Sequence, residues 1–394
     1  MKVALAYSGG LDTTVMIKWI SKNYKADVVS VTVDVGQDED MKEIEEKAYK
    51  SGAVKHYSID AKERFAEEFV KRAIKANALY ERNYPLCAAL SRPLIAEEVA
   101  KVALKEGCDA VAHGCTGKGN DQLRFDATFS ATAPNLKIIA PVREWNMSRD
   151  EEIDFALEHN LPINPVKSRF SVDENLWGRS IEAAELEDPW SEPPAEAFKL
   201  VKPLSMTPDK PDEIVIGFEE GVPVSLNGRR MGLVEMVKEL NMVGGMHGYG
   251  VVDHIEDRVV GLKSREVYEL PAALILINAH IDLEKMFLGR RMQAFKQTVD
   301  SAWAELVYGG LWADPLRKAL DAFIDSSQRG VNGEVRVRLF KGSMRITGRK
   351  GVKPLYSREH ITYARESVFD QKAGEGFSKL WSLETRLNSL REKV

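Results

Sequence analysis

The chain has 394 residues, 44% of them hydrophobic and 29% charged, so it is long enough for two or three domains and too hydrophobic to be disordered. Its 55 basic and 60 acidic residues give a net charge of −5, which disfavours a protein that coats nucleic acid. The three cysteines form no Cys-x-x-Cys pair, which argues against a disulfide framework and a structural zinc site.

Apolar segments long enough to enter a membrane are not evident in the sequence. The most apolar stretch, residues 270–277, is far too short for a membrane helix. The apolar run before Gly9 is too short for a signal peptide. We therefore expect a cytoplasmic protein with no membrane partner.

Strand and helix signals alternate over residues 1–165. Short apolar runs predict strands at 3–7, 27–34, 54–59, 109–113 and 136–140. Helical periodicity predicts helices at 39–49, around 65–74, at 93–106, and after Asp12, which stands where an N-cap belongs. Strands joined through helices need crossover connections, so we predict an α/β domain with a doubly wound parallel sheet. Ligands of such sheets bind beyond the carboxyl ends of the strands.

The second half of the chain has a different texture. Prolines are concentrated in residues 162–211, which we interpret as a long surface loop. Strand signals at 213–218 and 222–226 precede Asn227-Gly228, a tight-turn dipeptide, and an alternating pair of strands surrounds the turn at 341–343. Helices are predicted at 280–308 and 315–326. The arginines at 336 and 338 are interpreted as a solvated strand face rather than a nucleic-acid site.

The C-terminal segment is predicted to be a helix with a leucine stripe. Leu380, Leu383, Leu387 and Leu390 recur at intervals of three and four residues over less than two heptads. The stripe could pack on the body of its own chain or against another subunit, and the pattern alone favours neither.

The most informative segment is Ser8-Gly9-Gly10-Leu11-Asp12-Thr13-Thr14, between the first strand and the first helix. Its glycines allow a close backbone approach to an anion, and the N–H groups of the new helix point toward that anion. It is neither a Walker A loop nor a Gly-x-Gly-x-x-Gly dinucleotide loop. The segment resembles the pyrophosphate loop of the ATP pyrophosphatase superfamily, whose members cleave ATP between the α- and β-phosphates.

A second loop, residues 113–125, offers glycines for backbone access together with Asn120, Asp121 and Arg124. This mixture of amide, anion and cation suits a zwitterionic amino acid better than a base or a sugar. As a string, the loop resembles the substrate loop of the argininosuccinate synthase family. Further segments along the chain are similar to that family, at 84–86, 171–176, 255–258 and 261–269.

The resemblance implies a two-step ligase of arginine biosynthesis. ATP would adenylate the ureido oxygen of citrulline, releasing pyrophosphate, and the amine of aspartate would then displace AMP to give argininosuccinate. It also implies a nucleotide domain at 1–165, an α+β synthetase domain at 166–364 and a C-terminal helix at 365–394, which in this family joins subunits of a homotetramer.

The residues carried over by motif fall into three sets. Those expected to bind ATP are Ala6, Tyr7, Ser8, Gly9, Gly10, Leu11, Asp12, Thr13, Thr14, Val33 and Gly114. Ser8 and Asp12 would lie closest to the reacting phosphates, with magnesium held mainly by the phosphates and Asp12 as a further candidate ligand. Val33 could equally be a core residue. Citrulline would contact Tyr84, Asn120, Arg124, Ser171, Ser180, Glu256 and Tyr268, and aspartate would contact Thr116, Asn120 and Asp121.

Two positions depart from the family pattern. Many members read Tyr-Pro-Leu-Gly-Thr-Ser where this chain has Tyr84-Pro85-Leu86-Cys87-Ala88-Ala89, so a hydroxyl is missing and Ala89 is left out of the citrulline site. The family usually has serine where this chain has Thr14, which keeps the hydroxyl.

Two other classes of protein share some of these sequence features. An enzyme that thiolates or modifies tRNA shares the phosphate loop but would normally have catalytic cysteines or a basic RNA-binding region. A nucleotide sensor similar to universal stress proteins would lack the 113–125 loop and the large second domain. We therefore expect small-molecule substrates and no nucleic-acid partner.

Overall fold

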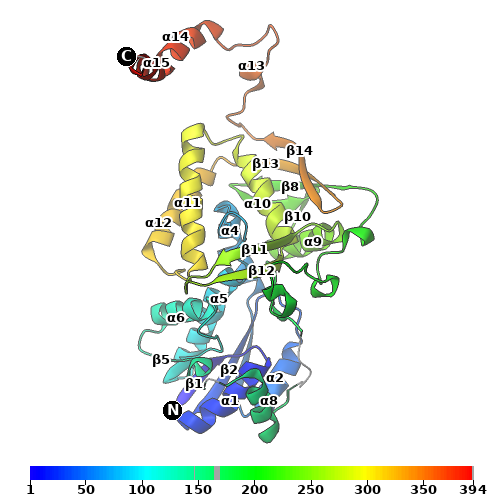
Figure 1. Ribbon diagram of the computed structural model, residues 1–394, viewed down its shortest axis with the longest axis vertical. Coiled ribbons are helices and arrows are strands. Elements are labelled where there is room, and N and C mark those ends of the chain that lie inside the picture. The colour runs from blue at the N-terminus through cyan, green and yellow to red at the C-terminus, as the bar shows by residue number, and fades with distance from the viewer. Residues whose placement is uncertain (146, 164–168, 393–394) are drawn as a thin grey trace. The chain divides into compact units, whose positions relative to one another are not determined.

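The computed structural model describes residues 1–145, 147–163 and 169–392 (Figure 1). The predicted domain boundary at residue 165 lies outside these described residues. The chain forms one compact unit over residues 1–352 and a second over residues 353–394. The first unit holds a parallel sheet and two antiparallel sheets.

The N-terminal part of the first unit is built on a five-stranded parallel sheet. Its strands are β1 (Lys2–Ala6), β2 (Asp27–Asp34), β3 (Lys55–Asp60), β4 (Ala110–Ala112) and β5 (Lys137–Ile139). They lie in the order β3-β2-β1-β4-β5, and every pair is parallel. The α/β class and the five predicted strands are thereby confirmed. The order reverses between β1 and β4, so the loops that follow these two strands diverge at the carboxyl edge and leave a crevice.

Alternate residues of β1 face two helical layers. Val3 and Leu5 pack with α1 (Leu11–Tyr24) and α2 (Met41–Lys50), whereas Ala4 and Ala6 face the core that contains α5 (Cys87–Lys105). The period of two along a strand sends neighbouring side chains to opposite faces. Both faces of the sheet are therefore covered. Further helices of this part are α6 (Asp121–Thr132), α7 (Pro141–Trp145) and α8 (Arg149–Glu158).

Two details of the helix prediction are wrong, and a third helix is confirmed but has a π-helical segment inside it. Asp12 is not the N-cap of α1, because the helix already begins at Leu11 and its N-cap is Gly10. The helix predicted from Pro93 begins six residues earlier at Cys87, with Pro93 inside it. The helix predicted around 65–74 is α3 (Lys62–Arg64), a π-helical segment η1 (Phe65–Val70) and α4 (Lys71–Lys75).

The rest of the first unit contains two antiparallel sheets. One has the order β10-β9-β8-β13-β14, formed by β8 (Asp212–Glu219), β9 (Val222–Leu226), β10 (Arg229–Arg230), β13 (Gly333–Phe340) and β14 (Ser343–Gly351). The other has the order β11-β12-β7-β6, formed by β6 (Ser171–Asn175), β7 (Gly178–Glu182), β11 (Val251–Asp257) and β12 (Lys263–Glu269). The predicted tight turn is confirmed, because Asn227 and Gly228 have φ values of 51° and 79° and join β9 to β10.

The long surface loop predicted for residues 162–211 is wrong in part. It contains β6 and β7 as well as the short helices η2 (Ala184–Glu187), η3 (Ala195–Ala197) and η4 (Leu204–Met206). The sequence of β6, Ser-Val-Asp-Glu-Asn, lacks the hydrophobic alternation that identifies a half-buried strand. One face of this strand is polar because it belongs to the candidate site described below.

Four helices complete the first unit: α9 (Leu233–Met246), α10 (Pro271–Glu284), α11 (Arg290–Tyr308) and α12 (Pro315–Gln328). The single helix predicted over 280–308 is wrong, since α10 and α11 are separate helices. The apolar stretch at 270–277 lies in α10, which is buried on most sides. Within the described residues, no helix is long and apolar enough to cross a membrane.

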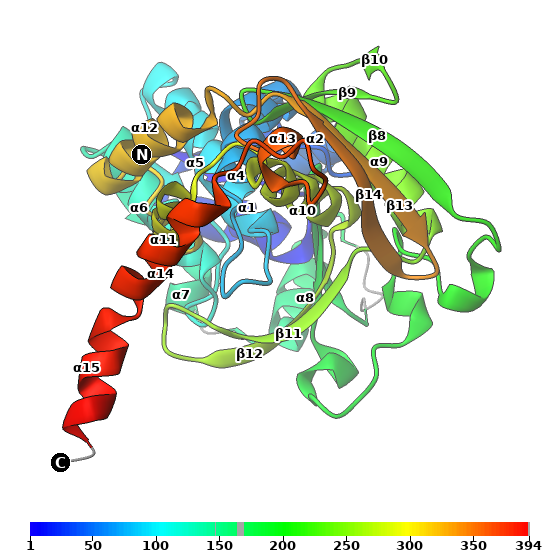
Figure 2. The ribbon, with the colours of Figure 1, turned by 90° about the horizontal axis from the view of Figure 1, so that it is seen from above.

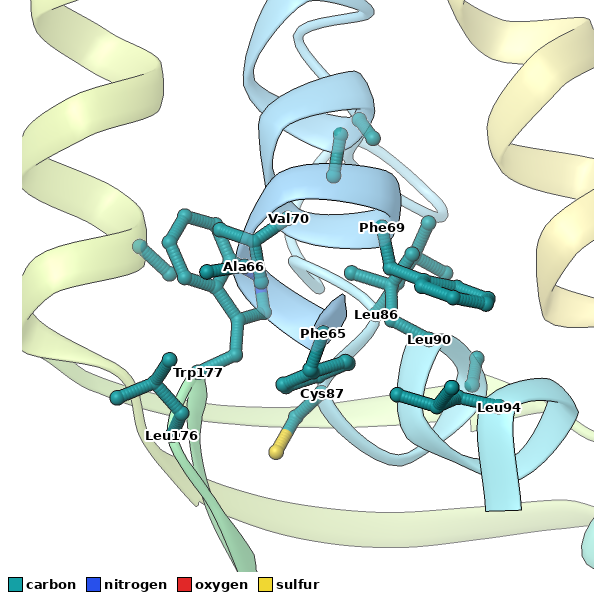
Figure 3. Close-up of a cluster of buried hydrophobic side chains, with 14 of the residues drawn as sticks. Phe65, Ala66, Phe69, Val70, Leu86, Cys87, Leu90, Leu94, Leu176 and Trp177 are labelled. Carbon is teal, nitrogen blue, oxygen red and sulfur yellow. The ribbon is translucent and has the colours of Figure 1, made fainter. Parts of the chain in front are cut away.

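A cluster of buried side chains joins the N-terminal part, which contains the parallel sheet, to the rest of the first unit (Figure 3). Phe65 and Phe69 of η1 face residues of α5, whereas Trp177, in the turn between β6 and β7, lies beside Ala66 and Val70 of η1 (Figure 3). The indole of Trp177 donates a hydrogen bond from Nε1 to the carbonyl of Pro85 at 2.8 Å. The turn is thus fixed directly beside the start of α5.

The second unit, described by itself, consists of α13 (Arg358–Ile361), α14 (Gln371–Trp381) and α15 (Leu383–Arg391). The predicted C-terminal helix is present as α14 and α15, which meet at Ser382 (Figure 2). Phe377 and Trp381 stack at 5.5 Å along α14. The four leucines of the stripe are between 45% and 74% exposed.

Candidate functional site

The loop between β1 and α1 is shaped by two glycines. Gly9 has a φ of +77°, which favours glycine, and a Cβ there would lie 3.1 Å from Ile44. Gly10 is the N-cap of α1, and because it has no side chain it cannot cap the first N–H groups of the helix. The first N–H groups of α1 are therefore directed into the crevice at the carboxyl edge of the sheet, where an anion can accept from them.

The hydroxyls of this loop divide into two pairs. Ser8 Oγ and Thr13 Oγ1 are 3.2 Å apart on the exposed side of the loop. Tyr7 and Thr14 are 3% and 1% exposed, and their oxygens pair with each other at 3.2 Å. Ser8 and Thr13 can thus offer hydroxyls to a ligand, whereas the side chains of Tyr7 and Thr14 belong to the core.

Asp12 lies in the first turn of α1 and is hydrogen-bonded to Glu152 of α8. Glu152 is 6% exposed. Burial raises the pKa of Glu152 to about 8, and the charge of Asp12 and the hydrogen bond to it add to the rise. Glu152 is therefore largely protonated at neutral pH beside the 8–14 loop. Glu152 was not predicted, because it lies 140 residues from Asp12 in an ordinary acidic helix.

Val33 lies near the end of β2 and Gly114 follows β4, the two strands that flank β1 in the parallel sheet. Val33 is 4% exposed, and its carbonyl accepts a hydrogen bond from Gln37 Nε2 at 3.0 Å. Gly114 follows β4, and a Cβ there would lie 2.8 Å from Met16 Cε of α1. The backbone after β4 thus approaches α1 closely. Leu11 and Ala6 complete the predicted ATP set at the two ends of the loop.

In the segment 113–125, residues 113–120 form a loop and Asp121 begins α6. A side chain from the first turn of α6 is hydrogen-bonded back to the loop. Gln122 donates from Nε2 to the carbonyl of Gly117 at 2.6 Å. Asn120 is the N-cap of α6, and Thr116 is exposed in the loop. Asn120 uses both ends of its amide, because Nδ2 donates to Tyr308 Oη at 2.8 Å and Oδ1 accepts from the N–H of Val259 at 2.9 Å.

Arg124 is 4% exposed and is held from two sides. Nη1 donates to Asp121 Oδ1 at 2.7 Å, and Nε donates to the carbonyl of Tyr308 at 3.1 Å. Within the described residues, its Nη2 is buried and has no hydrogen-bond partner. A buried guanidinium nitrogen without a partner is costly, so a carboxylate ligand would complete its hydrogen bonding.

Asp121 is bound by a second arginine that was not predicted. Arg92 of α5 donates from Nε to Asp121 Oδ2 at 2.8 Å, and its Nη2 is 2.9 Å from Asp173 Oδ2. Burial opposes ionisation of Asp121, but the charges of Arg92 and Arg124 and their hydrogen bonds outweigh it and lower its pKa to about 2. Asp121 is therefore a carboxylate at neutral pH.

One face of the four-stranded sheet carries most of the other predicted residues. Asp173 lies opposite Ser180, which lies opposite Tyr268, so three adjacent strands contribute one row. Ser171 is two residues before Asp173 on β6 and therefore faces the same side. His254 and Glu256 follow at the same spacing along β11, whose Val252 lies opposite Tyr268. Strand alternation thus collects residues that are distant in sequence.

Glu256 is 4% exposed and is held by two phenols. Tyr308 Oη donates to Oε1 at 2.7 Å, and Tyr268 Oη donates to Oε2 at 2.8 Å. Burial acts to raise the pKa of Glu256, but hydrogen bonds from His254, Tyr308 and Tyr268 and the charge of Arg124 lower it overall. A carboxylate kept ionised in a buried place can accept from an ammonium group.

Tyr84 completes the buried aromatic wall of this site. Its ring stacks on Tyr268 with centroids 4.2 Å apart, and its hydroxyl accepts from the N–H of Ala88 at 3.1 Å. Ala89, where the family pattern departs, is fully buried in α5. The structure therefore brings together Tyr84, Asn120, Asp121, Arg124, Ser180, Glu256 and Tyr268 through contacts, strand pairing or stacking. Ser171 is placed near these residues only by its position on β6, and Thr116 only by its position in the loop before α6.

A glycine-rich loop at the switch point of a doubly wound sheet, next to a buried site with both a cation and an anion, defines a nucleotide-binding α/β enzyme that also takes a small polar substrate. The family model described as the arginosuccinate synthase N-terminal HUP domain matches residues 2–162, and that of the arginosuccinate synthase C-terminal domain matches residues 170–388. The chain belongs to the argininosuccinate synthase family. The predicted family and the expectation of an ATP-dependent ligase are thus confirmed.

Curated relatives agree over the whole chain. An argininosuccinate synthase of Pyrococcus furiosus is 54% identical over 98% of this chain and 94% of that protein. One from Pyrobaculum aerophilum is 52% identical over 100% of this chain and 99% of its own, and one from Dehalococcoides mccartyi is 49% identical over 100% and 97%. A solved structure described as a predicted subunit of a tRNA methyltransferase from Methanocaldococcus jannaschii covers 40% of this chain at 18% identity, with a TM-score of 0.28.

Proposed function

We propose that the chain joins citrulline to aspartate in two steps at the site described above. In the first, the ureido oxygen of citrulline attacks the α-phosphorus of ATP, an O–P bond forms, and pyrophosphate leaves. In the second, the aspartate amine attacks the ureido carbon, a C–N bond forms, and AMP leaves with the oxygen. A ureido carbon is a poor electrophile, so its oxygen must first become part of a good leaving group.

The observation that carries this proposal is a pair of buried, opposite charges, Arg124 and Glu256. They lie near the carboxyl edge of the parallel sheet, where the 6–14 loop also lies. Arg124 has a buried nitrogen with no partner among the described residues, and Glu256 is a buried carboxylate held ionised. The two charges match the α-carboxylate and α-ammonium groups of a free amino acid. Tyr84, Tyr268, Ser171, Ser180 and Asn120 would surround the same substrate, and fixing it in this way brings its ureido oxygen into line with the α-phosphate.

ATP would be bound by residues 6–14, with Val33 and Gly114 meeting the adenosine through their backbones. The N–H groups at the start of α1 and the hydroxyls of Ser8 and Thr13 would receive the phosphates. Aspartate would enter beside Thr116, Asn120 and Asp121. The ionised Asp121 would accept from its ammonium group.

Magnesium fits the carboxyl pair at the start of α1. Magnesium favours oxygen ligands and is commonly held by one or two carboxylates together with substrate phosphates. The charge of Asp12 acts on the buried Glu152 next to it, so the two carboxyl groups are close enough to bind one cation together. Bound there, magnesium would neutralise charge on the phosphates. Within the described residues, no group of three or more metal-binding side chains offers a rival site.

The proposed activity is tested by exchange of labelled pyrophosphate into ATP with and without citrulline. We expect exchange only with citrulline and in the absence of aspartate. Because slow release of pyrophosphate can hide exchange, a single-turnover search for citrullyl-AMP accompanies it. Exchange without citrulline, or ligation without any adenylated intermediate, would contradict the two-step chemistry.

We further propose that the protein is a homotetramer and that it is cytoplasmic. We also propose that each chain is divided into three regions, at 1–165, 166–364 and 365–394. The exposed leucines of α14 and α15 support a role in assembly, since an apolar stripe in water is unfavourable. Deleting the chain from Gly376 should shift the sedimentation coefficient to that of smaller species. An unchanged tetramer would show that the stripe does not hold it together.

A further inference from the structure

Tyr308 is the last residue of α11 and is fully buried. It contacts three residues assigned above to citrulline, two through its hydroxyl and one through its backbone carbonyl. Its hydroxyl accepts from Asn120 Nδ2 at 2.8 Å and donates to Glu256 Oε1 at 2.7 Å, and its carbonyl accepts from Arg124 Nε at 3.1 Å. One residue of the second part of the unit thus meets the amide, the carboxylate and the guanidinium of the site.

The ring of Tyr308 is held as firmly as its hydroxyl. It stacks on Tyr80 with centroids 3.5 Å apart and planes inclined by 5°. The guanidinium carbon of Arg124 lies 5.2 Å from the ring centroid, in cation–π range. Tyr80 itself donates from its hydroxyl to the carbonyl of Asp257 at 2.7 Å, next to Glu256 on β11. The ring contacts with Tyr80 and Arg124 therefore help to set the position of the Tyr308 oxygen.

The single proton of the phenol determines the direction of the hydrogen bonds around it. Burial first, and then the charge and hydrogen bonding of Glu256, raise the pKa of Tyr308 far above its usual value, so the phenol stays protonated. Ionised Glu256 can only accept, so the phenol donates to it. The phenol must then accept from Asn120 Nδ2, which leaves Asn120 Oδ1 facing the N–H of Val259.

We propose that Tyr308 is a positioning residue for citrulline adenylation: its hydroxyl orients the Glu256 carboxylate and the Asn120 amide, while its backbone carbonyl orients Arg124. This inference rests on the proposed citrulline site. It adds to that site a residue on α11, an element that carries none of the residues assigned to substrate. Without the hydroxyl, Asn120 Nδ2 loses its acceptor and Glu256 Oε1 loses its donor, so both groups can turn away from the substrate.

The test is Tyr308→Phe, which keeps the ring, the stacking and the carbonyl but removes the hydroxyl. A hydrogen bond to a charged group is commonly worth a factor of about ten to a hundred. We therefore expect kcat/KM for citrulline in pyrophosphate exchange to fall by about that factor, mainly through KM, while KM for ATP stays within about threefold of wild type. ATP binding measured directly serves as the check that the variant is folded.

The matched control is Tyr80→Phe. This change also removes a buried phenolic hydroxyl and keeps the stacked ring pair, but the lost hydrogen bond runs to a backbone carbonyl. We expect its kcat/KM for citrulline to stay within about threefold of wild type. Equal losses in the two variants would show that general packing, rather than the Tyr308 hydroxyl, carries the effect, and would overturn the inference.

A double-mutant cycle with Glu256→Gln tests whether Tyr308 acts through Glu256. If it does, adding Tyr308→Phe to Glu256→Gln should cost much less than it does in wild type. Additive losses would overturn this route. If wild type shows no citrulline-dependent exchange, the proposed function fails; if wild type exchanges and Tyr308→Phe matches it, only the role of Tyr308 fails.

Discussion

The proposed phosphate loop and the proposed amino-acid site lie at the same edge of the parallel sheet but are built in opposite ways. The loop comes from nine consecutive residues, 6–14, and its shape is set by Gly9, Gly10 and the start of one helix. The amino-acid site draws on β6, β7, β11, β12, α5, α6 and α11. Its shape is set by hydrogen bonds between side chains, such as those from Arg92 to Asp121 and from Tyr308 to Glu256.

This difference predicts how each region responds to substitution. A backbone-shaped loop tolerates most side-chain changes and depends on a few glycines and charges. A site held by side-chain networks propagates each change to its neighbours, because a buried polar group left without a partner is costly. Substitutions in the loop should therefore affect one ligand, whereas those in the network should affect every step that depends on a group left without its partner.

The largest effect is expected for Asp12→Asn. The loss of this carboxylate should lower kcat by about 1,000-fold, because Asp12 would help to hold the magnesium ion that neutralises charge on the reacting phosphates. The measurement is steady-state ligation, with circular dichroism to confirm folding. Asp154→Asn, an exposed carboxylate on α8, is the control and should behave as wild type. A folded Asp12→Asn enzyme with near wild-type turnover would contradict the role.

Arg124→Gln and Asp121→Asn should separate the two half-reactions. Arg124→Gln should lower both pyrophosphate exchange and ligation by about 100-fold, since misplacement of the ureido oxygen by about 1 Å has an effect of that order. Asp121→Asn should spare exchange within about fivefold and lower ligation by about 100-fold. Asparagine keeps an oxygen that Arg124 can still bind. Equal loss of exchange in both variants would mean that the loop is not divided between the two amino acids.

Arg92→Met should change the pH dependence of ligation. Asp121 has a depressed folded-state pKa of about 2, so its ionised form contributes above its unfolded pKa and is lost only as the pH falls through about 2. Without Arg92, burial raises this pKa and moves the loss toward neutral pH. At saturating citrulline and ATP, the ratio of ligation rates at pH 8 and pH 5.5 should rise by about tenfold relative to wild type. An unshifted profile would show that Arg124 alone keeps Asp121 ionised.

The smallest effect is expected for Gly9→Ala. The positive φ and the close approach to Ile44 make alanine strained by about 1–3 kcal/mol, which should raise KM for ATP about fivefold and leave KM for citrulline unchanged. Gly107→Ala is the matched control, since Gly107 also has a positive φ of +61° but no neighbour within 4 Å of the added Cβ. A rise in KM for citrulline of the same size would show that the two regions are not independent.

The predictability of each region from sequence follows the same division. The parallel sheet could be predicted because its strands are continuous apolar runs, and the loop because its motif is contiguous. β6 was missed because its polar face removes the alternation that marks a strand. Arg92 and Tyr308 were missed because each is an unremarkable helical residue until the fold brings Asp121 or Glu256 against it. The resemblance to a family supplied the other citrulline residues, which no local pattern would have indicated.

The hydrogen bond between Asn120 and Tyr308 joins residues 188 positions apart, and this separation sets a schedule for the growing polypeptide. Ribosomes add about 5–20 residues per second, so Tyr308 is synthesised about 10–40 seconds after Asn120. The strands of the parallel sheet have all been made by then. An unfinished chain could thus hold nucleotide while lacking the means to orient the amino acid. The proposed role of Tyr308 therefore implies that adenylation begins only after residue 308 of the 394 has been translated.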